Sequence, residues 1–327
     1  MNRLNQTLIV LLVLQLIVAA IILVPRPAPA SEGESLYPGL EASRVVGLTI
    51  TGANGETLYL AKRDGAWVLP EADDYPVMED KVPPLLDKLV ALQAGQPVTE
   101  TAASHKRLKV AEDDFERLVE FELDDGTLYQ LYVGSSPSYG ATHIRVGGED
   151  MVYLTSELSL LDVETAVSAW VDRAYLDIPT EQIVAMTIEN ANGSLDLRNI
   201  GEPGWMLTDQ AGDETLDQTV VTSLVNRAAY VTLLRPLGRE EKADYGMANP
   251  SAVVTLRTHS EEDGDQTYTL WVGAQNPEDN SYVVRSSESA YYVRVSEYSV
   301  QDLVEYTRAD LMEVPPTPTP ELTPESP

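Results

Sequence analysis

The residues that could act as bases or metal ligands are few, and their spacing joins none of them into a site. The chain has three histidines, His105, His143 and His259. None has a second His, Asp or Glu at metal-ligand spacing on an obvious shared element, so we expect each at a surface or hairpin position. The chain contains no cysteine, which excludes disulfides, thiolate metal sites and cysteine nucleophiles. The sequence therefore predicts no metal site and no cofactor.

A serine pair is the strongest candidate for a nucleophile. Ser135 and Ser136 follow Gly134 at the end of an apolar run, whereas a second copy of the same segment carries Ala274 and Gln275 there. The duplicated unit thus does not need a hydroxyl at this place. The chain also has no G-x-S-x-G, P-loop, G-x-G-x-x-G after a strand, or H-E-x-x-H pattern. We therefore predict no catalytic residue.

Runs of acidic residues could place paired carboxylates or bind calcium. They are Asp73–Asp74, Glu112–Asp114, Asp124–Asp125 and Glu261–Asp263. All lie at expected turns or helix starts, where aspartate is locally favoured. The best calcium candidate, Glu261–Asp265, lacks the alternate-residue spacing and the distal bidentate glutamate of an EF-hand loop. We interpret these runs as solvated turns.

Two tryptophans stand at equivalent positions of the chain, Trp67 and Trp205. Stacking on a ligand is one role for such a pair, because an aromatic ring offers a large apolar face. The alternative, which we favour, is a core aromatic that closes the first strands of each copy onto a helix. Trp67 and Trp205 are the candidate ligand contacts that the sequence offers.

The charge balance limits the partners of the chain. Its 327 residues include 22 Lys and Arg against 52 Asp and Glu, a formal net charge of −30. Phosphate neutralisation needs clustered basic residues, so nucleic acid is excluded as a ligand. The same excess of acid argues against binding flat on anionic lipid.

The N-terminus predicts a membrane anchor. Leu8 to Val24 is an apolar run with one polar side chain, Gln15, and no charge, at the lower edge of the length that spans a bilayer. Arg3 precedes the run and a strongly acidic region follows it, which places the N-terminus in the cytoplasm and the body outside. The alternative is a cleaved signal peptide, because Ala28-Pro29-Ala30 forms a small-x-small site. Whether the segment is an anchor or a cleaved signal peptide, we expect the rest of the chain to be exported.

Internal duplication organises the body. At a constant offset, Val46–Leu69 and Val184–Leu207 share eight identical residues in 24 aligned pairs. The match resumes where Tyr129–Gly134 aligns with Tyr268–Gly273. The sequence predicts two copies of one unit. The expected divisions are an anchor at 1–30, a flexible neck at 31–43, repeat units at 44–172 and 182–307, and a Pro/Thr-rich tail at 308–327.

Hydrophobic periodicity predicts three strands, a helix, four strands and a closing helix in each copy. Asn54-Gly55 and Asn192-Gly193 indicate two-residue hairpin turns. Pro83 and Pro84 fit only the first turn of a helix that starts near Asp80 or Lys81. A short helix over 157–169 closes the first copy. Since hairpin connections dominate, we expect an α+β fold with mainly antiparallel sheets. Gly134 and Gly273 are expected at strand ends where no side chain is tolerated.

The order and spacing of these features resemble one family. The features are the N-terminal span, Trp67-Val-Leu and Trp205-Met-Leu, the following apolar helix, Tyr245–Pro250 before a strand, Leu270–Gly273, and a Tyr-rich hairpin at 282–293. Together they are similar to the domain of unknown function 4340 family of bacterial membrane-anchored proteins. The first copy departs from the pattern, because Leu108–Ala111 contains no proline. The resemblance implies an accessory protein of ABC-2-type permeases and gliding-motility-type auxiliary subunits, and it carries over no catalytic residue.

The sequence therefore predicts a non-enzymatic, membrane-anchored extracytoplasmic protein that assists an ABC-type export complex. Its expected partners are the lipid bilayer, through residues 8–24, and a permease with its auxiliary subunits. The alternative is an extracytoplasmic module that binds a ligand or a cell-wall glycan through Trp67, Trp205 or the Tyr-rich hairpins. A hydrolase would need an acidic pair that converges in a pocket.

Overall fold

The computed structural model describes residues 33–313 except 203, 213 and 263. Over this range the fold mixes helices with mainly antiparallel sheets, which confirms the predicted class at this level. The chain divides into two compact units. The first comprises residues up to Arg44, Thr51–Glu56 and Leu85–Val163, and the second comprises Val45–Ile50, Thr57–Pro84 and residues from Glu164 onward.

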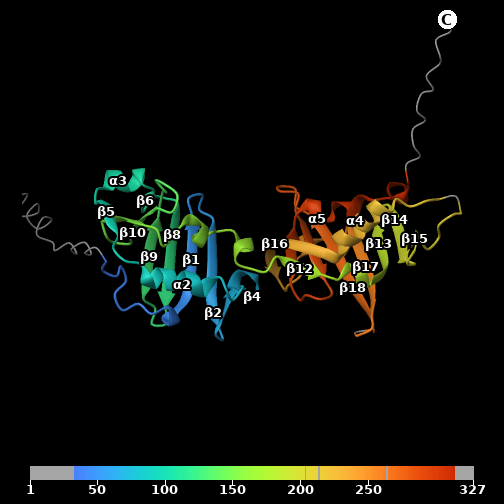
Figure 1. Cartoon of the computed structure of the whole chain (residues 1–327), viewed down its shortest axis with the longest axis horizontal. Helices are drawn as coiled ribbons and strands as arrows, with labels where there is room; N and C mark the ends of the chain where they lie inside the picture. Colours follow the sequence, from blue (N-terminus) through green and yellow to red (C-terminus); the bar gives the residue numbers. More distant parts are fainter. Residues whose placement is uncertain (1–32, 203, 213, 263, 314–327) are drawn as a thin grey trace, which may run out of the picture. The chain divides into compact units, whose positions relative to one another are not determined.

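One sheet has nine strands in the order β4-β3-β2-β1-β8-β9-β10-β11-β5. Its strands are β1 (Val45–Gly52), β2 (Thr57–Arg63), β3 (Ala66–Leu69), β4 (Tyr75–Pro76), β5 (Gln96–Thr99), β8 (Arg117–Leu123), β9 (Leu128–Val133), β10 (Thr142–Val146) and β11 (Val152–Thr155). A small ribbon joins β6 (Val110–Ala111) to β7 (Asp114–Phe115). Figure 1 labels β1, β2, β4, β5, β6, β8, β9 and β10 among these strands.

The other large sheet also has nine strands, in the order β12-β16-β20-β19-β18-β17-β13-β14-β15. Its strands are β12 (Ala174–Asp177), β13 (Ile183–Asn190), β14 (Gly193–Asn199), β15 (Trp205–Leu207), β16 (Tyr230–Gly238), β17 (Ala252–Ser260), β18 (Gly264–Gln275), β19 (Tyr282–Ser286) and β20 (Tyr292–Val295). The strand order β3-β2-β1-β8-β9-β10-β11-β5 of the first sheet matches β15-β14-β13-β17-β18-β19-β20-β16 of this one. Eight strands thus follow the same path in both sheets.

Four α-helices occur in the described range: α2 (Val82–Ala91), α3 (Ala102–Arg107), α4 (Gln218–Ala229) and α5 (Glu297–Glu305). Helix α2 begins with Val82-Pro83-Pro84, as the prolines predict, because its first turn needs no backbone N–H. Helix α4 begins after Asp217, whose carboxylate accepts hydrogen bonds from the backbone N–H groups of Thr219 and Val220. One apolar stripe of α4 is buried, so the helix is held by packing as well as by its cap.

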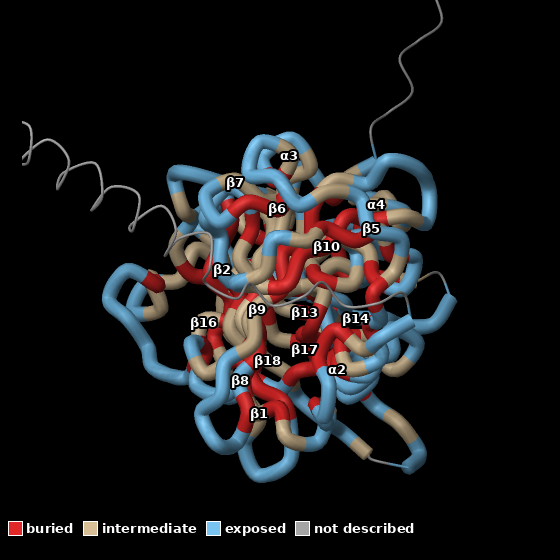
Figure 2. The backbone as a smooth tube through the Cα atoms, turned by 90° about the vertical axis from the view of Figure 1, so that its left-hand side faces the viewer, coloured by how far each residue is buried: buried red, intermediate tan, exposed pale blue. Residues whose placement is uncertain are grey.

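Burial follows the strand period in both sheets. In β17, Ala252, Val254 and Leu256 are buried while the residues between them are half-buried. Figure 2 shows the buried stretches as red segments along strands such as β10 and β17, with exposed loops around them. Alternating apolar residues thus bury one face of these strands, which is the pattern that the sequence predicts.

The closing segment of the first copy differs from the predicted helix over 157–169. Two short 3-10 helices, η3 (Leu160–Val163) and η4 (Val167–Ala169), stand there. The backbone N–H and the hydroxyl of Ser159 both donate to Asp162 Oδ2 at 2.8 Å. Serine and aspartate side chains that form hydrogen bonds with nearby backbone groups compete with the α-helix. The apolar spacing does not report this competition, and it therefore predicts an α-helix that does not form.

The first hairpin of the second copy turns one residue earlier than predicted. Asn190 pairs with Gly193, so the turn residues are Ala191 and Asn192. In the first copy the backbone N–H of Gly52 donates to the carbonyl of Glu56, which encloses a longer loop. The two hairpin loops therefore differ by one residue, and a constant offset cannot align both strands.

The predicted membrane anchor at residues 8–24 lies outside the described residues, as do residues 1–32 and the tail from 314 onward. Between residues 33 and 313, no described helix combines the length and the apolar character that crossing a bilayer requires.

Arg308, in the 3-10 helix η7 (Arg308–Leu311), ties the end of the fold to an acidic loop. Its Nη1 lies 2.7 Å from Asp209 Oδ1, and its Nε lies 3.0 Å from Glu214 Oε1. Hydrogen bonds from the Arg308 side chain, together with one from the backbone N–H of Ala211, lower the pKa of Glu214 to about 2. Because this pKa is depressed on folding, the stability it contributes is present above the unfolded pKa of about 4.3 and is lost as the pH falls through about 2.

We expect the R308M variant to return the pKa of Glu214 toward about 4.3. An NMR titration of the glutamate and aspartate carboxyl carbons measures this shift directly. Asp125 serves as the internal control, because Thr127 and Arg44 hold its pKa at about 2. An unchanged pKa of Glu214 in the variant would show that Arg308 does not hold this carboxylate.

Candidate functional site

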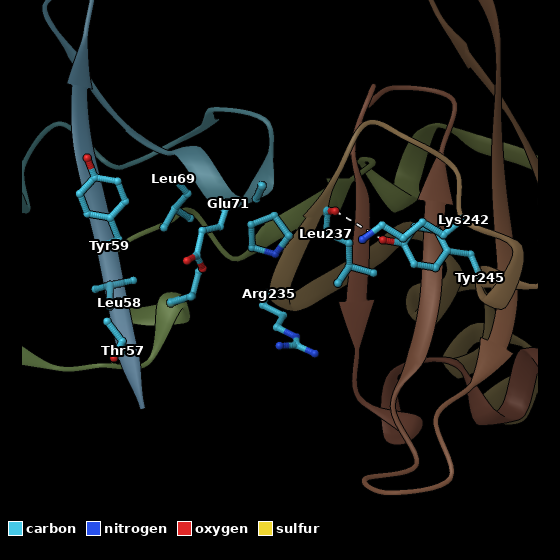
Figure 3. Close-up of a pocket in the computed structure, with 12 residues that line it drawn as sticks. Thr57, Leu58, Tyr59, Leu69, Glu71, Arg235, Leu237, Lys242 and Tyr245 are labelled. Carbon is cyan, nitrogen blue, oxygen red and sulfur yellow. Dashed lines mark hydrogen bonds between the residues drawn. The ribbon is translucent and has the colours of Figure 1, made fainter. Parts of the chain in front are cut away.

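A pocket of about 310 Å³ opens in the second unit. Strands β2 and β3, the 3-10 helices η2 (Pro70–Ala72) and η4, strand β16 and the η6 turn (Ala243–Tyr245) contribute its walls. The lining residues are Thr57, Leu58, Tyr59, Leu69, Glu71, Ala72, Val167, Arg235, Pro236, Leu237, Lys242 and Tyr245. Figure 3 shows their side chains around one shared space.

Charged side chains line the mouth of this pocket. Arg235 and Lys242 are exposed cations, and Glu71 is an exposed carboxylate. Figure 3 shows Glu71 and Arg235 extending into the same space. The ammonium of Lys242 lies 5.8 Å from the centre of the Tyr245 ring, within range of a cation–π contact. In a chain with a net charge of −30, the lining of this pocket carries two cations against one carboxylate.

The apolar wall of the pocket is built by β16 and η6. Tyr245 is buried, and its hydroxyl donates a hydrogen bond of 3.4 Å to the carbonyl of Leu237. The Tyr245 ring also packs against Tyr292, with 5.3 Å between the ring centres. Pro236 is tolerated in β16 because the pairing of this strand with β20 shifts register on both sides of it.

The segment after η2 is fixed by side chains of the same unit. Asp73 has a left-handed backbone with φ of 54°, and its Oδ2 accepts a 2.6 Å hydrogen bond from the backbone N–H of Arg239. A side chain at Gly238 would lie 2.5 Å from that carboxylate oxygen. Tyr291 donates from its hydroxyl to the carbonyl of Asp74 at 3.2 Å and packs edge-on against Tyr75. The carboxylate of Asp73 therefore binds a backbone N–H, while that of Asp74 pairs with Arg63 Nε at 3.1 Å.

The charged and hydroxyl side chains of this pocket can bind polar groups. Arg235 and Lys242 attract a carboxylate or phosphate, while Glu71 suits an amino or hydroxyl group. Tyr59 and Thr57 add hydroxyls that donate or accept. Among the residues that line it, the pocket offers no histidine, cysteine or serine for nucleophilic attack with a neighbouring base.

The structure brings one serine and one histidine together. Ser135 Oγ lies 3.2 Å from His143 Nδ1, but the same Nδ1 lies 2.7 Å from the carbonyl oxygen of Ser135. The carbonyl requires Nδ1 to carry the proton, so this nitrogen cannot accept the serine proton. The Ser135 hydroxyl also donates to the carbonyl of Leu108 at 3.2 Å. The pair thus fastens the loop between β9 and β10.

The histidines lie deeper than the sequence predicts. His105 is buried in helix α3, so the expected surface or hairpin position is wrong for it, and its Nε2 lies 2.6 Å from the carbonyl oxygen of Asp150. His143 is also buried, but it lies in the hairpin of β10 and β11. His259 is exposed, and its Nδ1 lies 2.7 Å from Asp265 Oδ1. Within the described residues, no group of three or more His, Asp or Glu could hold a metal ion.

Both predicted ligand-contact tryptophans are buried. Trp67 is 8% exposed and Trp205 is 7% exposed. Gln218, the first residue of α4, holds the backbone of Trp205 by accepting from its N–H at 2.8 Å and donating to its carbonyl at 2.9 Å. Neither tryptophan lines the pocket of Figure 3, so the structure does not bring them together with Arg235 and Lys242. A ligand contact by these rings stays a prediction.

Two other acidic runs form ion pairs with lysine or arginine. Asp124 and Asp125 lie 2.9 and 2.6 Å from the Arg44 guanidinium. Asp113 and Asp114 pair with Lys106 and Lys109, each at 2.7 Å. These exposed pairs contribute little to stability. The calcium candidate Glu261–Asp265 includes residue 263, which lies outside the described residues.

No sequence motif singles out the pocket residues Arg235 and Lys242. A signal was present, because four of the 22 Lys and Arg residues fall within residues 227–242 of an acidic chain. That cluster could have drawn attention to this stretch. Glu71 and Tyr59 carry no such signal in the sequence, because only the fold brings them close to Arg235 and Lys242.

Comparison with known proteins identifies a family. A family model described as a domain of unknown function, DUF4340, matches residues 67–241, which is more than half of the chain. The match begins at Trp67 and ends just before Lys242. No curated protein matches the chain, and no solved structure matches it.

Proposed function

Since the chain belongs to the domain of unknown function 4340 family, we propose that it is a non-enzymatic accessory protein that assists an ABC-type export complex. In this proposal residues 8–24 anchor it by a single span with the N-terminus in the cytoplasm. Two tandem copies of the α+β unit then form an extracytoplasmic body.

The observation that carries this proposal is the make-up of the pocket in Figure 3. Its charged side chains, Arg235, Lys242 and Glu71, are exposed at its mouth and suited to reversible contacts. A nucleophile with a matched base is missing from its lining, so the pocket supports recognition more than catalysis. A surface of this kind fits a protein that works by contact with a partner.

The class of partner comes from the family resemblance. A permease with auxiliary subunits lies in the same membrane as the proposed anchor, which raises the local concentration of the two proteins. The cations of the pocket would then meet an acidic group on the partner. Charge reversal at the pocket should weaken the complex if this is correct.

A second candidate is a module that binds a small ligand or cell-wall glycan. The size of the pocket favours it, because about 310 Å³ lies at the lower end of the range for small-molecule sites. An acidic ligand would use the same Arg235 and Lys242. The two candidates differ in what is recovered with the protein.

The test is crosslinking in native membranes followed by purification of the full chain in mild detergent. We expect the unaltered protein to recover a permease or its auxiliary subunit. The R235E/K242E variant should recover at least about tenfold less, the effect of roughly 1.4 kcal/mol. The R198E/R257E variant is the matched control, since it changes the charge equally at exposed positions of β14 and β17.

The outcome separates the candidates. Recovery of no permease or auxiliary subunit with the unaltered protein would reject the export proposal. Recovery of wall glycan in their place would establish the second candidate. Equal recovery by both double variants would remove the pocket from the interaction.

A further inference from the structure

Two arginines occupy matching places in the two sheets. In β10, Arg145 pairs across the strands with Tyr132 of β9, and in β19, Arg285 pairs with Trp271 of β18. Each aromatic residue stands two positions before a glycine, Gly134 or Gly273. The first sheet therefore shows what an arginine at this place can bind.

The Arg145 side chain donates hydrogen bonds to two main-chain carbonyl groups. It is 4% exposed, and its Nε donates to the carbonyl of Val110 at 2.7 Å. Its Nη1 donates to the carbonyl of Glu149, also at 2.7 Å. The guanidinium carbon lies 4.4 Å from the centre of the Tyr132 ring. The bound group at this place is thus a segment of peptide backbone that crosses the sheet.

Arg285 lacks the corresponding acceptor. Its Nη1 donates to the hydroxyl of Tyr292 at 2.9 Å, and its guanidinium carbon lies 5.1 Å from the centre of that ring. Its Nε is buried and finds no hydrogen-bond acceptor among the described residues. A buried donor without an acceptor is unfavourable, so this nitrogen is a vacant position for an acceptor.

Met247 takes the place that Val110 has in the first sheet. A side-chain carbon of Val110 lies 2.6 Å from the position of a Cβ at Gly134, and the terminal carbon of Met247 lies 2.9 Å from that of a Cβ at Gly273. The valine presents its carbonyl to the arginine, whereas the methionine leaves Arg285 Nε without one. Methionine is flexible and adapts its shape to neighbouring groups, so Met247 can move aside for a ligand.

A small pocket surrounds this vacant position. It has a volume of about 160 Å³ and is lined by Glu241, Met247, Trp271, Arg285 and Tyr292. Glu241 accepts a hydrogen bond of 3.0 Å from the Tyr292 hydroxyl. Glu241 already places a carboxylate in the lining of this pocket, so a neutral carbonyl fits better than a second anion. Trp271 and Met247 add apolar surface for one side chain.

We propose that this pocket binds one residue of an extended peptide segment from a partner protein. The main-chain carbonyl of that residue accepts a hydrogen bond from Arg285 Nε, and its apolar side chain lies against Trp271 and Met247. The bound peptide reproduces the contact that Val110 makes with Arg145 in the first sheet. This binding does not depend on the export role proposed above.

The test uses N-acetyl-leucine N-methylamide as a minimal peptide probe and the full chain in mild detergent. The readout is the ¹⁵N–¹H signal of Arg285 Nε, assigned by its loss in the R285K variant. We expect a saturable shift of this signal. The W271A variant should bind about tenfold more weakly, and M247A should also bind more weakly, because each removes apolar surface that holds the leucine side chain. The R257K variant, at an exposed position of β17, should bind as the unaltered protein does.

Three results would overturn the proposal. The first is no shift of the Arg285 signal at any probe concentration. The second is an equal shift with sodium acetate, which would make the pocket a carboxylate site. The third is an equal shift with N-acetylglucosamine, which would make it a glycan site.

Discussion

The G273A variant is expected to lose about 2–4 kcal/mol of unfolding free energy. A Cβ at this position would lie 2.1 Å from the carbonyl oxygen of Tyr245 and 3.3 Å from its carbonyl carbon. Both are backbone atoms and cannot rotate away as a side chain can. The alanine must therefore push the Tyr245 turn off the sheet, which also disturbs the packing of Tyr245 on Tyr292.

Urea unfolding of the full chain in mild detergent, followed by tryptophan fluorescence, measures this loss. The matched control is G212A, in the same unit, where nothing lies within 4 Å of the added carbon and φ is not positive. That variant should stay within about 0.5 kcal/mol of the unaltered protein. Equal midpoints for the two variants would show that the turn does not contact Gly273 as described.

The second large effect is expected at the paired arginines. The R145L variant should lose about 3 kcal/mol, because it leaves the buried carbonyl of Val110 and the half-buried carbonyl of Glu149 without their charged donor. The R285L variant should lose about 1 kcal/mol or less, since its Nη1 bonds one hydroxyl and its Nε bonds none of the described residues.

The same unfolding measurement compares these two leucine variants side by side. Because both substitutions remove an arginine from an equivalent strand pair, differences in strand propensity largely cancel. A loss for R285L as large as that for R145L would mean that Arg285 already has full partners in the free protein. The vacancy inferred at its Nε would then not exist.

Strand positions with strong alternation could be predicted from the sequence. In β17, one of the four strands expected after the helix of the second copy, buried Ala252, Val254 and Leu256 alternate with half-buried residues. The prediction that Gly134 and Gly273 tolerate no side chain has a physical cause, since a carbonyl oxygen lies within 2.2 Å of each added Cβ. Local pattern is sufficient where burial alternates along one strand.

Other strands could not be predicted in this way. Strand β16 contains Arg235 and Pro236, which interrupt its apolar pattern and weaken any strand signal. Its counterpart β5 is four residues long, contains Pro97 and is mostly exposed. Both strands are held by pairing with distant partners, β20 and β11. These two segments form strands because of tertiary contacts, and a short stretch of sequence carries no information about such contacts.

The candidate site was beyond the reach of the sequence for a similar reason. Tyr59 and Glu71 join Arg235 and Lys242 only because the segment Thr57–Pro84 belongs to the second compact unit. The sequence separation between them exceeds 160 residues. Periodicity and motifs describe neighbours along the chain, and they do not report which distant side chains share a pocket.

Site-directed photocrosslinking in native membranes tests the central claim most directly. A photoreactive amino acid replaces Arg235 in one full-length variant and Arg198, an exposed residue of β14, in another. The proposed function predicts that position 235 yields a covalent product with a permease or auxiliary subunit and that position 198 does not. Products at neither position, or equal products at both, would contradict recognition of an export complex through this pocket.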